Sequence, residues 1–390
     1  MSNSTVQILA RVLRVLLIFA LLLNVLALLL VPASVMVNAE NLFGGAGTFL
    51  HDLFHPEADD VTAAGVSAIF LSWVWIWGEG ANALIALFLV ICGICTALIL
   101  LQGLRVLGTI LQGAPFSTQN AVSLRRAAVC SFCIAGAALL RTIWGLWFYQ
   151  SLRPLATYNA LFVPIFTMFG LLCLVMSALF RQATEMKAEN DLTILEEAHA
   201  MVRTAAQKIA DVLIFLCGFL IFCDILLLPL TPALAYFRFQ NPASMRFDHL
   251  LAVFAYDFDD GVGNLLEIIL KESWKSPETA VLALFLLLAG ICGAVILVQG
   301  IRLLASVADG TPFSPKNAVY LQRAAAGCFV IAAGALGRTA FTLCRDGAAA
   351  LLSYTALFIP LFTMAGLLCL VMAGLFHRAA EMKAENDLTI

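Results

Sequence analysis

Apolar residues along this chain fall into eight long runs that are separated by more polar stretches. A helix needs ~20 consecutive apolar residues to cross ~30 Å of hydrocarbon, and every one of these runs is about that long. The pattern therefore predicts an all-α protein with eight transmembrane helices. The expected spans are 12–33, 81–104, 127–149, 160–181, 209–232, 279–302, 322–344 and 356–377.

The composition agrees with a protein whose surroundings are the lipid bilayer. Hydrophobic residues make up 62% of the chain and charged residues only 12%, and the mean hydropathy is +0.97. Soluble domains are roughly half apolar and about a quarter charged. The first apolar run is longer than the ~7–15 residues of a signal-peptide core, so we expect it to be retained as a helix.

The basic residues predict an orientation, because segments rich in Lys and Arg stay on the cytoplasmic side. If both termini are cytoplasmic, fourteen of the 22 Lys and Arg residues lie on that side. All six Trp residues then map to the outer helix ends, where aromatic side chains are typical. We therefore expect a multi-pass protein of the bacterial cytoplasmic membrane with both termini inside.

The chain contains a long internal repeat. Its last ten residues, EMKAENDLTI, already occur at 185–194, and 26 of 34 positions are identical between 161–194 and 357–390. Farther back, the stretch LQGLRVLGTILQGAPFSTQNAVSLRRAA (101–128) aligns with VQGIRLLASVADGTPFSPKNAVYLQRAA (298–325). The sequence thus predicts two four-helix repeats, residues 1–194 and 195–390.

An even number of spans gives both repeats the same orientation in the membrane. We therefore expect parallel repeats related by a pseudo-twofold axis along the membrane normal. Tandem fusion of this kind is typical of a former homodimer, so the functional unit is expected to be a monomer that mimics one. The third and seventh spans carry runs of small residues, such as Ala333 and Gly337 at a spacing of four, and are predicted to form the bundle centre with close helix approach.

Two motifs of each repeat resemble a family of bacterial membrane proteins, that of domain-of-unknown-function 2975. The first is a Gly-x-Pro-Phe-Ser…Asn loop, at 113–120 and 310–317, and the second is the E-x-K-x-E-N-D-L-T-I tail, at 185–194 and 381–390. The resemblance implies four-span units, present here twice. It also implies a partner, because members of that family are often encoded beside a small helix-turn-helix regulator.

The repeated loop and tail are candidate contacts for a cytosolic partner. The loop is also consistent with a tight hairpin, in which a serine caps the next helix and the phenylalanine lies at the membrane surface. The tail is also consistent with a polar flank of the fourth helix, which Asn190-Asp191 can end. The spacing does not separate these interpretations. The candidate contact residues are Phe116, Ser117, Asn120, Arg126, Phe313, Ser314, Asn317, Arg323, Glu189, Asn190, Asp191, Glu385, Asn386 and Asp387.

Two arginines fall inside predicted spans, about eight residues from the outer ends. An arginine held there costs ~2.5–3.5 kcal/mol on insertion scales and normally faces a polar partner inside the bundle. Asp224 and Asn24 lie at a similar depth. We therefore predict that Arg338 pairs with Asp224, and that Arg141 meets Asn24 or shares Asp224. Such an intramembrane polar site either fixes the helix register or contacts an anion, a lipid headgroup or a substrate.

Signatures of enzymes, metals and cofactors are absent from the sequence. It has no P-loop, dinucleotide fingerprint, G-x-S-x-G or H-E-x-x-H motif. All eleven Cys residues lie in predicted spans, where a thiol is a small packing group. The outer segments around His51 and Asp257 are acidic but lack a zinc or calcium spacing. We expect no catalytic residues, no bound metal, no cofactor and no direct binding to nucleic acid.

Two specific functions remain open on the sequence alone, beside a purely structural role. The first is a non-catalytic membrane regulator or sensor that engages a cytosolic protein through the loops and tails. The second is a transporter or channel for a small solute, with an Arg/Asp site between the repeats. The sequence identifies no solute, signal or partner.

Overall fold

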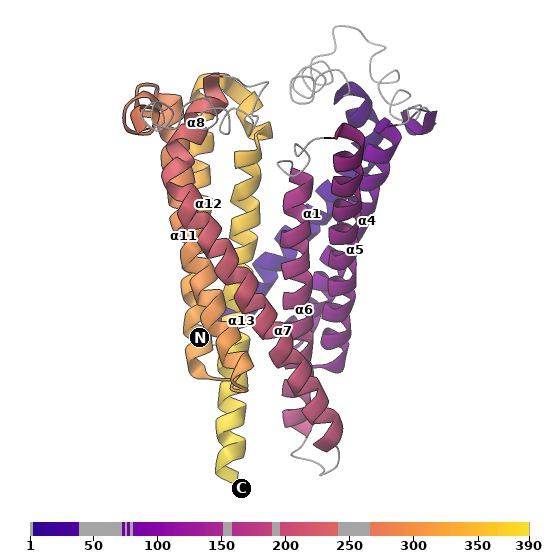
Figure 1. Ribbon diagram of the computed structural model, residues 1–390. Helices are drawn as coiled ribbons and strands as arrows, with labels where there is room; N and C mark the ends of the chain where they lie inside the picture. Colours follow the sequence, from indigo (N-terminus) through magenta and orange to yellow (C-terminus); the bar gives the residue numbers. More distant parts are fainter. Residues whose placement is uncertain are drawn as a thin grey trace. The chain divides into compact units, whose positions relative to one another are not determined.

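The computed structural model of the chain describes residues 3–38, 72–74, 76–78, 81–150, 158–188, 196–240 and 266–389 (Figure 1). Within these ranges the regular structure is helical, without strands. The α-helices are α1 (Asn3–Asn38), α4 (Ala81–Leu111), α5 (Thr118–Tyr149), α6 (Tyr158–Ala188), α7 (Glu196–Leu227), α8 (Thr231–Gln240), α11 (Pro277–Ala308), α12 (Pro315–Asp346) and α13 (Tyr354–Thr389). Short 3₁₀ turns are η1 (Ile76–Gly78), η3 (Leu228–Leu230), η4 (Glu272–Trp274) and η5 (Gly347–Leu352).

Eight helical segments of the described chain are long and apolar enough to cross a membrane. Each of them contains or largely overlaps one of the predicted spans, so the prediction of an all-α protein with eight spans is confirmed. The fifth segment joins α7, η3 and α8, because prolines at 229 and 232 interrupt the regular helix near its C-terminal end. The predicted boundary between the repeats, at residue 194, lies outside the described residues.

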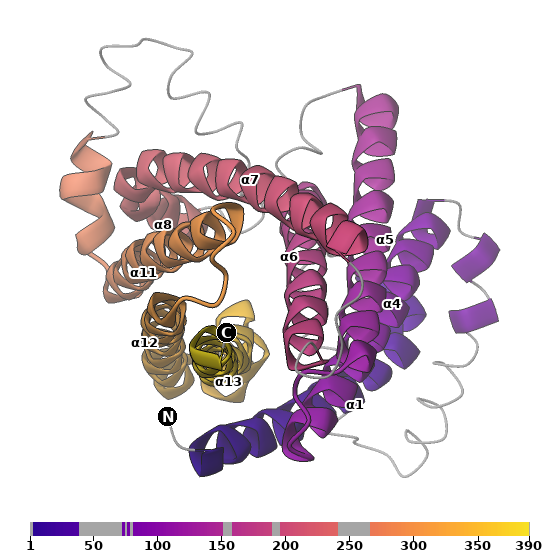
Figure 2. The ribbon, with the colours of Figure 1, turned by 90° about the horizontal axis from the view of Figure 1, so that it is seen from below.

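The chain forms two compact units. One consists of Arg14–Ser177 and the other of Met1–Leu13 with Ala178–Ile390. In the first unit α4 packs against α5, and Phe132 of α5 lies against Gly170 of α6. In the second unit α11, α12 and α13 pack in sequence, side by side in both ribbon views, and Phe329 of α12 lies against Gly366 of α13 (Figure 2).

Matched contacts also attach the first helix of each repeat to the second helix. Leu28 of α1 fills the space over Gly93 of α4, and Leu228, just after α7, does the same over Gly290 of α11. Because a side chain at either glycine would occupy the position of the leucine, these glycines allow the helices to approach. Similar local packing thus follows from the repeated sequence in both units.

The third and seventh spans, α5 and α12, are the most buried of the eight candidate spans. Their place at the centre of an eight-helix bundle stays a prediction. Nothing lies within 4 Å of a Cβ built at Gly337, so this glycine makes no close approach within its own unit. Close approach of the third and seventh spans to each other stays a prediction. Tight contacts of these two helices are made by Phe132 and Phe329, which lie over glycines of the following helix, and by Leu288 of α11, which lies over Gly334 in the small-residue run of α12.

Candidate functional site

The two membrane-embedded arginines occupy equivalent environments. Arg141 of α5 lies with its guanidinium carbon 4.8 Å from the ring centre of Phe88, and Arg338 of α12 lies 5.7 Å from that of Phe285. Phe88 and Phe285 are 197 residues apart, as are the two arginines. The face of an aromatic ring carries partial negative charge, so each ring attracts the cation beside it.

Arg338 has a further polar contact, because its Nη1 donates a hydrogen bond to Oγ1 of Thr355 on α13. Thr355 is buried, so this bond supplies an acceptor for the guanidinium inside the three-helix packing of α11, α12 and α13. Sequence reasoning missed Phe88, Phe285 and Thr355. The two phenylalanines could have been found as residues conserved between the repeats at the same 197-residue offset as the arginines.

The structure does not form the predicted pair between Arg338 and Asp224. A carboxylate oxygen of Asp224 lies 3.3 Å from the place where a Cβ of Gly290 would be, on the side of α11 that packs against α7. Phe285, which receives Arg338, is five residues before Gly290. Five residues rotate a helix by about 140°, so the two contacts lie on different sides of α11.

Arg141 does not pair with Asn24 among the described residues either. Oδ1 of Asn24 is buried and has no hydrogen-bond partner. An arginine has only N–H donors and would have to bind this oxygen, so the predicted contact is absent. The predicted pairs Arg338–Asp224 and Arg141–Asn24 are thus replaced by an arginine beside a phenylalanine within each unit. Sharing of Asp224 by Arg141, which would join the two units, stays a prediction.

The asparagines of the repeated loop connect the end of one helix to the start of the next. Nδ2 of Asn120 donates to Oγ1 of Thr109 (2.7 Å) and to the carbonyl of Pro115 (2.7 Å). In the second repeat Nδ2 of Asn317 donates to Oγ of Ser306 (2.6 Å) and to the carbonyl of Pro312 (2.6 Å). Both asparagines are buried, at 1% and 0% exposure. They therefore hold the loop and do not contact a partner, which corrects their predicted role.

Other loop residues follow the same hairpin geometry. Oγ of Ser117 accepts a hydrogen bond from the backbone N–H of Asn120 (3.3 Å), as predicted for a helix cap. Ser314 precedes α12 without such a bond, and a proline begins that helix. Gly113 and Gly310 have φ of 80° and 73°, which favours glycine at these positions.

The phenylalanines of the loop also belong to the packing. Phe313 is buried, and its ring centre lies 6.2 Å from that of Phe376 on α13, which excludes it from a partner surface. Phe116 is half-buried. Arg126 and Arg323 are exposed, as a contact role requires.

The repeated tails are described only in part. Residues 189–191 lie outside the described residues, and so do the side chains of Asn386 and Asp387. Glu385 is exposed on α13. The helix end predicted at Asn190-Asp191 lies outside the described residues. In the second repeat α13 continues through the matching Asn386-Asp387 to Thr389.

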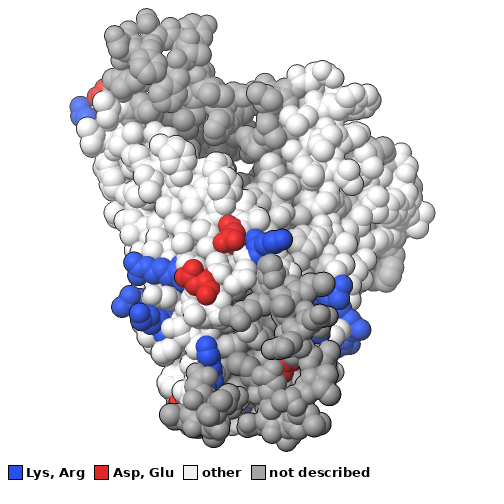
Figure 3. Space-filling view, turned by 60° about the horizontal axis from the view of Figure 1, so that its bottom comes forward, with Lys and Arg blue, Asp and Glu red and all other residues white. Residues whose placement is uncertain are grey.

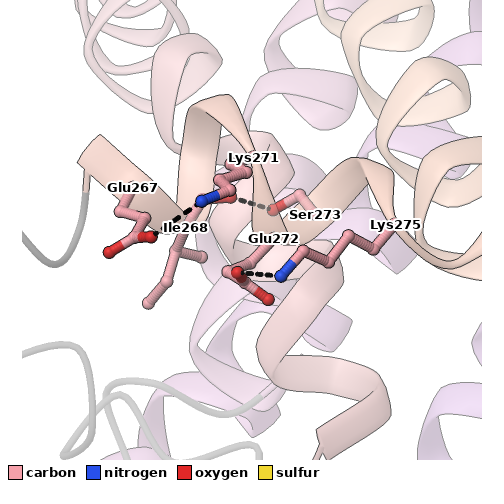
Figure 4. Close-up of polar contacts among 6 residues, drawn as sticks. All are labelled: Glu267, Ile268, Lys271, Glu272, Ser273 and Lys275. Carbon is pink, nitrogen blue, oxygen red and sulfur yellow. Dashed lines mark hydrogen bonds and ion pairs between the residues drawn. The ribbon is translucent and has the colours of Figure 1, made fainter.

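The opposite end of the second repeat carries a compact polar turn around η4 (Figure 4). The hydroxyl of buried Ser273 lies within hydrogen-bonding distance of the carbonyls of Ile268 (2.7 Å) and Pro232 (2.9 Å). Lys271 pairs with Glu267 (3.6 Å) and Lys275 with Glu272 (2.5 Å). The hydrogen bond from Lys275 to Glu272 raises the pKa of the lysine. These contacts build a surface turn and indicate no chemistry.

The comparisons with known proteins identify one family. The family described as "Protein of unknown function (DUF2975)" matches residues 50–194 and again residues 209–390. No curated protein and no solved structure matches the chain.

Proposed function

Since the chain belongs to the DUF2975 family of proteins of unknown function, we propose, from its own loops, that it is a non-catalytic membrane regulator that engages a cytosolic protein. The observation that carries this proposal is the loop that occurs in both repeats with the same buried asparagine bonds. A loop held in this way presents its exposed residues in a fixed geometry, which reduces the entropy lost on binding.

The proposed contact surface consists of the exposed loop residues and the two tails. The exposed residues of the loops that are suited to polar contacts are Gln112, Thr118, Gln119, Thr311 and Lys316. We propose that this end of the protein faces the cytoplasm of a bacterial cell and that the partner is a small helix-turn-helix regulator, as the family resemblance implies. Nucleic acid is then bound by the partner and not by this chain.

The experiment compares partner recovery by the full chain and by a variant with alanine at four loop positions, 118, 119, 311 and 316. These substitutions leave the asparagine bonds in place. Regulator recovery is measured by affinity purification from native membranes with quantitative mass spectrometry. The alanine variant is expected to recover the regulator in roughly tenfold lower yield than the unaltered chain, which corresponds to a loss of ~1.4 kcal/mol in binding free energy. A matched control removes Glu267 and Lys271 at the opposite end. Equal recovery by the loop variant and the control would contradict the proposal.

The alternative, a transporter with an Arg/Asp site between the repeats, has less support. It relied on a carboxylate beside Arg338, whereas Thr355 and Phe285 are the contacts of that guanidinium. Two arginines beside aromatic rings within separate units do not by themselves define a path for a solute.

A further inference from the structure

Four exposed arginines occupy matched positions near the loop end of the two repeats. They are Arg105 and Arg126 on α4 and α5, and Arg302 and Arg323 on α11 and α12. The second pair is offset from the first by 197 residues at both positions. Among the described residues none of the four has an acidic partner, although the chain pairs other arginines, such as Arg181 with Glu185 (2.9 Å) and Arg345 with Glu278.

The loop hydrogen bonds fix the level of each pair along its helices. The bond between Asn120 and Thr109 (2.7 Å) sets the register of antiparallel α4 and α5. A helix rises 1.5 Å per residue, so Arg105 lies about 6 Å and Arg126 about 9 Å farther into the span than this hydrogen bond. The bond between Asn317 and Ser306 (2.6 Å) gives the same levels for Arg302 and Arg323. The two cations of a pair therefore lie within about one helical turn of each other along the axis.

In the second repeat the two arginines also share one face of the helix pair. The guanidinium carbon of Arg302 lies 6.0 Å from the ring centre of Tyr320 on α12. Arg323 follows Tyr320 by three residues, and positions three apart are neighbours on a helix surface. Tyr320 thus orients Arg302 and is a neighbour of Arg323 on the surface of α12. The residue at this position in the first repeat is Ser123.

The depth of these pairs matches the phosphate layer of a bilayer. Helix α5 has 32 residues, or about 48 Å, so about 9 Å extends beyond ~30 Å of hydrocarbon at each end. Arg105 lies about 9 Å from the end of α4, at the edge of the hydrocarbon. Arg126 lies about 12 Å into α5, and its side chain leans toward the N-terminus of the helix, which is the loop end. The side chain of Arg105 leans the other way, toward the N-terminus of α4, but its Cα already lies at the edge of the hydrocarbon. Both guanidinium groups are therefore within snorkelling distance of the headgroup region.

We propose that each repeat binds the phosphate of one anionic phospholipid, through Arg105 and Arg126 in the first repeat and Arg302 and Arg323 in the second. Guanidinium groups bind phosphate oxygens with paired hydrogen bonds, and two of them at one level fit a single headgroup. In the space-filling view several groups of Lys and Arg side chains stand out from a surface otherwise made mostly of uncharged residues (Figure 3). A protein partner is the less suitable occupant, because this depth is that of the lipid headgroups. The inference is independent of the proposed regulatory function.

The test counts lipids that remain bound to the purified full chain. The protein in mild detergent is incubated with phosphatidylglycerol or with phosphatidylcholine and analysed by native mass spectrometry. We expect two tightly held phosphatidylglycerol molecules and no retained phosphatidylcholine. One bound phosphatidylglycerol is expected to remain in the double variant Arg105→Gln with Arg126→Gln. One is also expected to remain in the double variant Arg302→Gln with Arg323→Gln. The variant with all four substitutions is expected to retain none. A control with the same loss of charge, Arg125→Gln with Lys316→Gln, keeps both.

Three results would overturn the proposal. They are equal retention of the two lipids, unchanged counts in the arginine variants, and displacement of phosphatidylglycerol by millimolar inorganic phosphate, which would indicate a site for the free anion. A protein occupant would also leave the lipid counts unchanged. If a glutamine variant does not give a monodisperse protein, the Arg→Lys variants replace it. The Arg→Lys variants should retain less phosphatidylglycerol than the wild type, since lysine lacks the paired donors of arginine.

Discussion

At the scale of single residues, the repeated motifs of this chain are used mainly to hold the fold. Asn120 and Asn317 are buried between a helix end and a loop, and Phe313 packs on Phe376. A residue kept in two copies of a sequence is therefore not evidence of an exposed contact. The exposed arginines nearby are equally well matched between the repeats, and exposure is what distinguishes the two groups.

Replacement of Asn317 with alanine is expected to lower stability. It removes the two hydrogen bonds of Nδ2 and leaves the carbonyl of Pro312 without this donor. Loss of a buried hydrogen-bonding partner costs ~1–3 kcal/mol, so the midpoint of thermal unfolding in detergent should fall. Lys316→Ala, at the exposed neighbouring position, is the control and should leave the midpoint unchanged. A midpoint equal in both variants would show that the asparagine does not hold the loop.

At the scale of helices, the position of a residue along the axis could be predicted, but the direction in which it faces could not. The eight spans follow from the length of the apolar runs, because the bilayer sets how long such a run must be. Asp224 and Arg338 lie at a similar depth in the sequence of their spans, but depth alone does not decide which neighbouring helix a side chain contacts. That depends on helix rotation, which is set by contacts such as Leu228 on Gly290. These contacts involve residues far apart in the sequence.

Replacement of Gly366 with leucine and replacement of Gly337 with leucine should have different effects on stability. A Cβ at Gly366 would lie 2.9 Å from the ring of Phe329, whereas nothing lies within 4 Å of a Cβ at Gly337. Overpacking in a helix interface costs ~1–3 kcal/mol, so Gly366→Leu should lower the thermal midpoint. Gly337→Leu should keep or raise it, since a glycine inside a helix is less favourable than other residues by ~1 kcal/mol. Equal losses in both variants would contradict the role of Gly366 in close packing.

At the scale of the whole molecule, the two repeats build matched local structures from similar sequences. Both carry an arginine beside a phenylalanine, an asparagine under a loop and a glycine under a phenylalanine. The segments between the first and second spans of the two repeats share little sequence. At the position of Ser273, which holds the polar turn, the first repeat has Ile76. The helices and their loops thus share one architecture, while the segments between the first and second spans follow each repeat's own sequence.

The remaining prediction concerns the sides of the membrane. Among the described residues, four candidate spans follow residue 192, beginning with Ala205–Tyr236 and ending with Thr355–Glu385. An even number of crossings returns the chain to the side from which it started, so we expect residue 192 and the carboxyl terminus to share one side. The excess of Lys and Arg there predicts that this side is the cytoplasm.

Protease accessibility in the full chain measures this directly. A specific protease site inserted after residue 192, and another before a C-terminal epitope, should both be cut in inverted membrane vesicles and both be protected in spheroplasts. A third site inserted near residue 257 serves as the control and should show the reverse pattern, because it lies between the fifth and sixth spans. Cleavage at the first two sites from opposite sides would require an odd number of crossings between them. That outcome would remove the basis for parallel repeats, and with it the placement of both phosphate sites in one leaflet.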